Sequence, residues 1–121
     1  MMIETKLQAR LKTIAPNVYP LAAPKSYLRP AVVWNRVSTD PTRDIGDDLE
    51  DTMFVTFQID VYSTLYDEAK ALSDTIRANL KDWVDPDIQS VSWSDERAGV
   101  DQTTDVQLFR AMVFYTVFCT S

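Results

Sequence analysis

The pattern of apolar and polar positions changes its period in the middle of the chain. From Met53 to Ser63 apolar residues alternate with polar ones, which is typical of a strand buried on one face. From Thr64 to Trp83 apolar residues recur instead at steps of three and four, which predicts an amphipathic helix. We therefore expect a strand that runs directly into a helix, with the helix packed back onto the sheet that contains the strand.

Weaker patterns of the same two kinds flank this central unit. Apolar residues at helical spacing near the N-terminus predict a first helix that ends before Pro16. Further strands are expected at Ala31–Ser38, Ile88–Trp93 and Asp105–Cys119. The predicted fold class is α+β: a four-stranded, mainly antiparallel sheet with two helices packed on one face, in the order α-β-β-α-β-β. A chain of 121 residues is expected to form a single domain, residues 1–121.

Two long connections join the predicted strands. Thr39–Asp51 links the first two strands, and Ser94–Thr104 links the last two. Connections of this length without secondary structure of their own are usually functional or disordered. The first one is strongly acidic, so we treat it as a candidate site. Its charged residues are Asp40, Arg43, Asp44, Asp47, Asp48, Glu50 and Asp51.

The last predicted strand is apolar on both of its faces. The row from Phe109 to Cys119 contains no charge, and we expect it to face the helices because burial of an unpaired charge is costly. The other row would then remain uncovered, and an exposed apolar patch of this size predicts a protein–protein interface. The alternative is that the N-terminal segment folds over this face within one subunit. The candidate interface residues are Phe54, Leu108, Met112, Phe114 and Phe118.

Charge is distributed unevenly along the chain, whose formal net charge is −6. Residues 1–38 are mainly basic, whereas residues 40–51 contain six acidic residues and one basic residue. Such polarity could serve head-to-tail contacts between copies, because unlike patches attract each other. A solvated surface of mixed charge is the alternative interpretation.

The residue types that most often perform catalysis are scarce. The chain has no histidine, and its single cysteine, Cys119, excludes an intrachain disulfide. Two glycines are too few for a phosphate-binding loop. A hydrolase that used the adjacent carboxylates of Asp95 and Glu96 would lack a nucleophile or base at a suitable spacing. We therefore expect no enzyme activity and no cofactor.

Metal and membrane sites are also not expected. The acidic connection lacks EF-hand spacing, so a solvated loop is favoured over a metal site, although weak divalent binding is an open alternative. No apolar run approaches the ~20 residues of a membrane span, and the N-terminus lacks the apolar core of a signal peptide.

Several short segments resemble the tail-completion proteins of tailed bacteriophages, a family related to tail terminator and head-to-tail joining proteins. Val18-Tyr19-Pro20 and Arg29-Pro30-Ala31-Val32-Val33 resemble the opening of that family. The segment from Phe57 to Ser63, followed by a helix that begins Tyr66-Asp67-Glu68-Ala69, is similar to its core. The resemblance extends over nearly the whole chain but contains no catalytic motif.

This resemblance implies a structural virion protein that forms a hexameric ring at the end of the tail tube, ends tube polymerisation and joins tail to head. The implied partners are copies of the same chain, the major tail tube protein and the head–tail connector proteins. The implied location is the tail or neck of the virion, after synthesis in the host cytoplasm. An extended loop between the early strands tends to face the channel in that family, and Thr39–Asp51 occupies the corresponding place. DNA would pass this loop without specific binding, because acidic residues repel phosphates.

Two alternatives to the tail terminator follow from the same features. One is a head-side connector or adaptor protein of the neck. The other is a small ferredoxin-like module that binds a peptide or RNA through exposed Phe54 and Phe114, as sheet aromatics do in RNA-binding domains. The acidic balance disfavours RNA, and measurable salt-dependent RNA binding would favour it.

Overall fold

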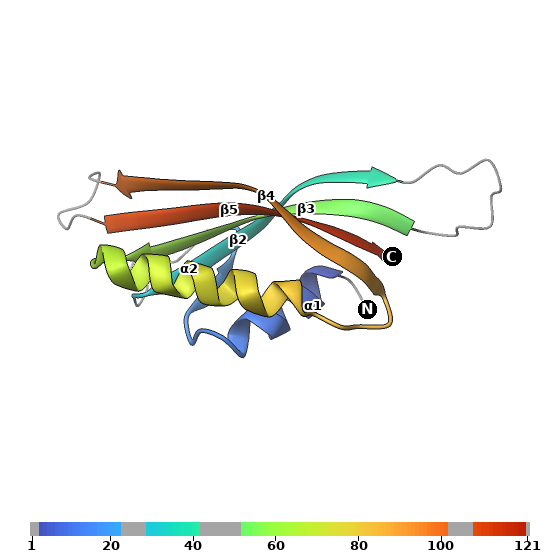
Figure 1. The fold of residues 1–121 in the computed structure, drawn as a ribbon, viewed down its shortest axis with the longest axis horizontal. Helices are drawn as coiled ribbons and strands as arrows, with labels where there is room; N and C mark the ends of the chain where they lie inside the picture. Colours follow the sequence, from blue (N-terminus) through green and yellow to red (C-terminus); the bar gives the residue numbers. More distant parts are fainter. Residues whose placement is uncertain (1–2, 23–28, 42–51, 102–107, 121) are drawn as a thin grey trace.

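The computed structural model describes residues 3–22, 29–41, 52–101 and 108–120. The described strands form one sheet in the order β1-β2-β3-β5-β4, in which β1 is parallel to β2 and all other neighbours are antiparallel. Both helices lie on the same face of this sheet (Figure 1). The elements along the chain are α1 (Ile3–Lys12), β1 (Val18–Pro20), β2 (Ala31–Pro41), β3 (Thr52–Ser63), α2 (Tyr66–Lys81), β4 (Ile88–Asp101) and β5 (Leu108–Thr120).

The prediction of a four-stranded sheet in the order α-β-β-α-β-β is wrong, because β1 adds a fifth strand and makes the sheet mixed. With three residues, β1 is too short to show an alternating pattern. Its last residue, Pro20, also favours a connection over a strand. Proline is tolerated in β1 because an edge strand need not donate every backbone hydrogen bond.

The strand β4 is longer than the predicted Ile88–Trp93 and continues to Asp101. Its second half was predicted to be a connection because it lacks alternating apolar residues. The structure gives the reason: β4 is the outer strand beside β5, and most of its residues are exposed, so no buried row is required. In the same way β2 continues past Ser38 to Pro41 and includes Asp40.

The hydrophobic core lies between the sheet and the two helices. The row of β5 that was predicted to face the helices is buried there, which confirms the prediction for this strand. On β2, Val32 and Trp34 face the core, a choice that the sequence pattern left open. The largest completely buried side chains of the core are Phe57, Leu7, Leu11, Ile59, Ile76, Leu80, Val32, Val55, Val61, Val113 and Val117.

Ion pairs attach α1 to the rest of the core. The Lys6 ammonium lies 2.6 Å from Asp85 and 2.7 Å from Asp87, in the connection between α2 and β4. The Arg36 guanidinium of β2 lies 3.0 Å from Glu4. Hydrogen bonding to Lys6 lowers the pKa of Asp85 from its ordinary value of 3.8. The ion pairs therefore tie the N-terminal helix to segments that are distant in the sequence.

The variant Lys6→Gln should show a smaller loss of stability in acid than the unchanged protein. A carboxyl group whose folded pKa is lowered stabilises the fold above its unfolded pKa, here 3.8, and this contribution disappears as the pH falls through the lower folded value. The difference in free energy of unfolding between the two proteins should therefore be constant from pH 7 to pH 5 and shrink below about pH 4. Urea unfolding at several pH values measures it.

The matched control is Lys12→Gln, which changes an exposed lysine on the same helix. The free energy of unfolding of this control should differ from that of the unchanged protein by the same small amount at every pH. If the difference in free energy of unfolding between Lys6→Gln and the unchanged protein did not change with pH, the assignment of the ion pair would be contradicted.

Candidate subunit interface

The face of the sheet opposite the helices carries an apolar patch, which we define as Phe54, Met112, Phe114 and Phe118. Among the described elements no helix covers this face (Figure 1). The pairing of β3 with β5 places Phe54 directly opposite Phe118, and their rings stack with centroids 4.6 Å apart. Phe54 is 43% exposed, and the other three side chains are half-buried. The register of two neighbouring strands therefore assembles most of the predicted interface residues on one surface.

Leu108, the fifth predicted interface residue, is on the same face but is only 2% exposed, so it offers a partner little area. The alternative, in which the N-terminal segment covers this face, does not occur for α1. The apolar residues of α1, Ile3, Leu7 and Leu11, join the core on the opposite face. The patch therefore has no covering helix from the described part of its own chain.

A buried carboxylate lies beside the apolar patch. Asp60 on β3 is 6% exposed, and its Oδ2 lies 2.9 Å from Nη2 of Arg110 on β5. The side-chain amide of Gln58 also donates to both carboxylate oxygens, at 3.2 and 3.1 Å. Such partners are required because an unpaired buried charge is strongly destabilising. The sequence pattern placed Asp60 among outward-facing polar residues, and nothing in it indicated that this aspartate is buried.

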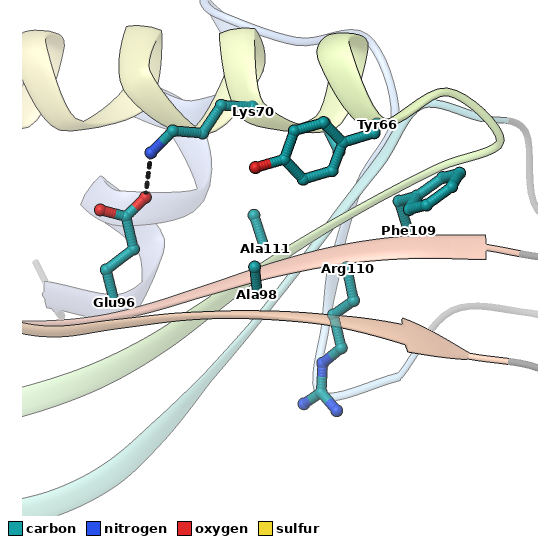
Figure 2. Close-up of a pocket in the computed structure, with 8 residues that line it drawn as sticks. Tyr66, Lys70, Glu96, Ala98, Phe109, Arg110 and Ala111 are labelled. Carbon is teal, nitrogen blue, oxygen red and sulfur yellow. Dashed lines mark hydrogen bonds and ion pairs between the residues drawn. The ribbon is translucent and has the colours of Figure 1, made fainter.

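A cavity of about 220 Å³ lies on the helix side of the sheet, between the start of α2 and strands β4 and β5. Figure 2 shows Lys70 hydrogen-bonded to Glu96 at one end and Tyr66 with Phe109 toward the other, whereas the side chain of Arg110 points away. We call this cavity the alanine pocket, because three small side chains leave space between the helix and the sheet. Its lining residues are Tyr66, Ala69, Lys70, Glu96, Ala98, Phe109, Arg110 and Ala111.

The carboxylate of Glu96 attaches the edge strand β4 to α2. Lys70 lies 2.7 Å from one oxygen and Arg77 lies 2.9 Å from the other. The hydrogen bond to Glu96 raises the pKa of Lys70. The guanidinium of Arg77 also lies over the ring of Trp93, 5.0 Å from its centroid, and this indole is 51% exposed. These charges hold the fold together.

The arrangement does not resemble a hydrolytic site. Asp95 and Glu96 are adjacent on a strand, opposite Phe114 and Val113 respectively, so they lie on opposite faces of the sheet. Each of these two carboxylates is paired with a basic side chain. Burial raises the pKa of the Cys119 thiol, which makes it a poor nucleophile.

The described ranges contain neither a candidate metal site nor a candidate membrane span. In those ranges no three His, Cys, Asp or Glu side chains gather closely enough to hold a metal ion. None of the helices in the same ranges is long and apolar enough to cross a membrane.

Of the predicted channel-facing residues, the structure describes Asp40. It is exposed near the end of β2, opposite Phe54. The ends of β2 and β3 that flank the acidic segment extend beyond the two helices (Figure 1). The other predicted residues, Arg43, Asp44, Asp47, Asp48, Glu50 and Asp51, lie outside the described residues.

Comparison with known proteins identified a matching family and solved structures of similar fold. The family model described as tail completion protein gp17 matches residues 5–120. A chain in the solved structure "Virion of native gene transfer agent (GTA) particle" has a similar fold, with a TM-score of 0.59 and 17% sequence identity. That alignment covers 95% of this chain and 84% of the other. No curated protein matches the chain.

Replacing Asp60 by alanine should lower the free energy of unfolding by about 2 kcal/mol, because Arg110 would lose a charged partner in a partly buried position. The variant Arg110→Ala should lower the free energy of unfolding by a similar amount. The double variant should cost about 1 kcal/mol less than the sum of the two, since the residues interact directly. Urea unfolding of the four proteins measures this coupling, and strictly additive costs would contradict the ion pair.

Proposed function

This chain belongs to the tail completion protein family, and from that premise we propose that it forms a hexameric ring at the end of a bacteriophage tail tube. Membership identifies it as a structural, tail-related protein of the virion, located in the tail or neck. In the proposed role the chain acts as a single domain, residues 1–121. The ring ends polymerisation of the tube and joins tail to head, with the major tail tube protein and the head–tail connector as its neighbours.

The observation that carries this proposal is the apolar patch on the face without a helix. A stacked aromatic pair and two further large apolar side chains lie on this face, although the same sheet buries an ordinary core on its other side. Contiguous exposed apolar surface typically marks a protein interaction site. We assign the patch, with Leu108 at its margin, to the contact between neighbouring subunits.

A ring of identical subunits also fits the asymmetry of the sheet. One edge consists of the short strand β1, and the other consists of the long strand β4. Two different surfaces that meet between copies form a heterologous contact, and repetition of this contact closes into a ring when the rotation allows it.

The acidic segment is assigned to the lumen of this ring. Thr39–Asp51 contains six acidic residues and one basic residue, so six copies would place a net charge of roughly −30 around the channel. Acidic walls repel DNA phosphates, which lets the genome pass without being held. The ends of β2 and β3 that flank residues 42–51 extend beyond the helices (Figure 1), and this supports the assignment.

The variant Phe114→Asp should remain folded and fail to assemble. Phe114 is half-buried and lies opposite Asp95, so the free energy of unfolding should fall by roughly 2–3 kcal/mol through lost apolar contacts and repulsion between like charges. A charge within the patch also opposes burial against a neighbour. Light scattering after size exclusion, together with a capping assay on purified tail tubes, measures assembly.

The control for this variant is Val84→Asp, which changes an aliphatic residue that is 90% exposed outside the patch. It should assemble normally. Unfolding of Phe114→Asp would show that Phe114 belongs to a core, and normal assembly of this variant would remove the patch from the interface.

Replacing the acidic residues between positions 44 and 51 by asparagine should leave ring assembly intact and impair DNA passage. The substitutions remove the repulsion between the proposed channel wall and the phosphates. Assembly is measured by light scattering, and DNA passage by the rate of genome ejection and by phage titre. An unchanged ejection rate and titre would refute the position of this segment in the lumen.

A further inference from the structure

A second cavity lies on the helix side of the sheet, beside the C-terminal half of α2. Its volume of about 270 Å³ exceeds that of an apolar cavity of about 150 Å³ that accepts a benzene molecule. Strand pairing places Trp93 of β4 directly opposite Tyr115 of β5, and Arg77 and Lys81 are one turn apart on α2. We call this cavity the tryptophan pocket. Its lining residues are Arg77, Lys81, Val91, Ser92, Trp93 and Tyr115.

The hydroxyl of Tyr115 is a buried polar group at this pocket. Tyr115 is 2% exposed, and its hydroxyl oxygen makes no hydrogen bond with any described residue. Buried hydroxyl groups in folded proteins usually have a partner, which is another protein group, an ordered water or a ligand. Burial raises the pKa of Tyr115, so this hydroxyl keeps its proton at neutral pH and is able to donate a hydrogen bond.

Lys81 brings to the pocket a positive charge that the described chain does not neutralise. It is exposed in the last turn of α2, and no described carboxylate forms an ion pair with its ammonium. The carbonyls near the end of the helix, which a lysine could also bond, already accept from the N–H groups of Asp82 and Trp83. The donors of Lys81 are therefore left for solvent or for a ligand.

The indole of Trp93 supplies an apolar wall beside these donors. Trp93 is 51% exposed, and the guanidinium of Arg77 lies 5.0 Å from the centroid of its ring. The carboxylates of Asp74 and Glu96 pair with this guanidinium. The charge in excess at the pocket is therefore that of Lys81. The described lining contains two basic side chains and no acidic one, in a chain whose formal net charge is −6.

We propose that the tryptophan pocket binds the carboxylate of an acidic side chain that a neighbouring protein of the virion presents. The carboxylate accepts hydrogen bonds from Lys81 and Tyr115, while the methylene groups of the same side chain lie against the indole of Trp93. Charge-assisted hydrogen bonds are roughly twice as strong as neutral ones, so a carboxylate is favoured over an amide. Tryptophan, tyrosine and arginine are also the residues most enriched in the energetic centres of protein interfaces.

The position of the pocket indicates which kind of neighbour presents this side chain. Tyr115 belongs to the inner row of β5, whereas Phe114 of the apolar patch belongs to the outer row, so the pocket and the patch lie on opposite faces of the sheet. A ring whose copies meet through the patch leaves the helix side to proteins other than this chain. This choice of partner rests on the proposed ring, whereas the binding site itself does not.

The direct test is a titration of the purified protein with N-acetylglutamate methylamide at constant ionic strength, followed through tryptophan fluorescence. Trp34 and Trp83 are buried, so the change in emission reports mainly Trp93. The corresponding glutamine compound should bind at least tenfold more weakly, because it lacks the charge. Equal binding of the two compounds, or displacement of the glutamate compound by an equimolar amount of inorganic phosphate, would overturn the assignment to an acidic side chain.

The variant Tyr115→Phe separates this inference from a structural role of the hydroxyl. Removal of an unpartnered buried hydroxyl should leave the urea midpoint unchanged or raise it, whereas the dissociation constant of the glutamate compound should increase at least fivefold. A loss of stability would show that the hydroxyl has a partner within the fold, and normal binding would show that it does not contact the ligand. Either result would overturn the site.

The variant Lys81→Gln tests the charge of the pocket. It should bind the glutamate compound at least tenfold more weakly than the unchanged protein does. The matched control is Lys12→Gln, which changes an exposed lysine of α1 and should bind normally. Normal binding by Lys81→Gln, or equal weakening in both variants, would remove Lys81 from the site.

Particle assembly tests the choice of partner. Phage that carry Lys81→Gln should yield fewer complete particles than phage that carry Lys12→Gln, whereas both purified variants should self-associate like the unchanged protein. A normal yield, or weaker self-association of Lys81→Gln, would overturn the assignment to another protein of the virion. If the unchanged protein binds the glutamate compound but neither self-associates nor caps tail tubes, the proposed ring fails and the site remains.

Discussion

The rest of the structure depends on a sheet that is covered by helices on one face only. The helices α1 and α2 pack on the same side, where their apolar residues meet Phe57 and the inner row of β5. Burial of these apolar side chains, which the hydrophobic effect favours, forms the core on that side. Strand β5 is nevertheless apolar on both faces, so its second row is left with Phe114 and Phe118 without a covering helix from the described chain. The incomplete second layer leaves apolar surface that the proposed ring would bury between subunits.

The charged residues of the described chain are used mainly to hold elements together. Lys6 joins α1 to the connection before β4, and Glu96 joins β4 to α2 through two basic partners. Asp60 is satisfied by Arg110 and by an amide. This use of charge agrees with a family whose members are structural parts of a tail.

The two edges of the sheet differ, as a repeated contact between copies in the proposed ring would require. The strand β4 is long, exposed and anchored by ion pairs, and it borders a pocket lined by small residues. The strand β1 is short and leads into Leu21, whose backbone is strained and whose side chain is exposed. Exposed sheet edges favour pairing with another chain unless they are blocked. The bulges and charges of β4 disfavour uncontrolled pairing of this edge.

The sequence by itself determined the elements with strong periodicity: the alternation in β3, the helical spacing in α2, and the inner row of β5, which was chosen because it has no charge. The family resemblance could also be recognised from short segments, although these segments contain no catalytic motif. Strand β1 and the second half of β4 could not be predicted, because edge strands need no buried row and leave no alternating pattern. The burial of Asp60, the left-handed Leu21 and the alanine pocket were decided by tertiary structure. Each depends on which strands become neighbours and on where α2 lies. The local sequence does not encode these contacts, because they join segments that are far apart along the chain.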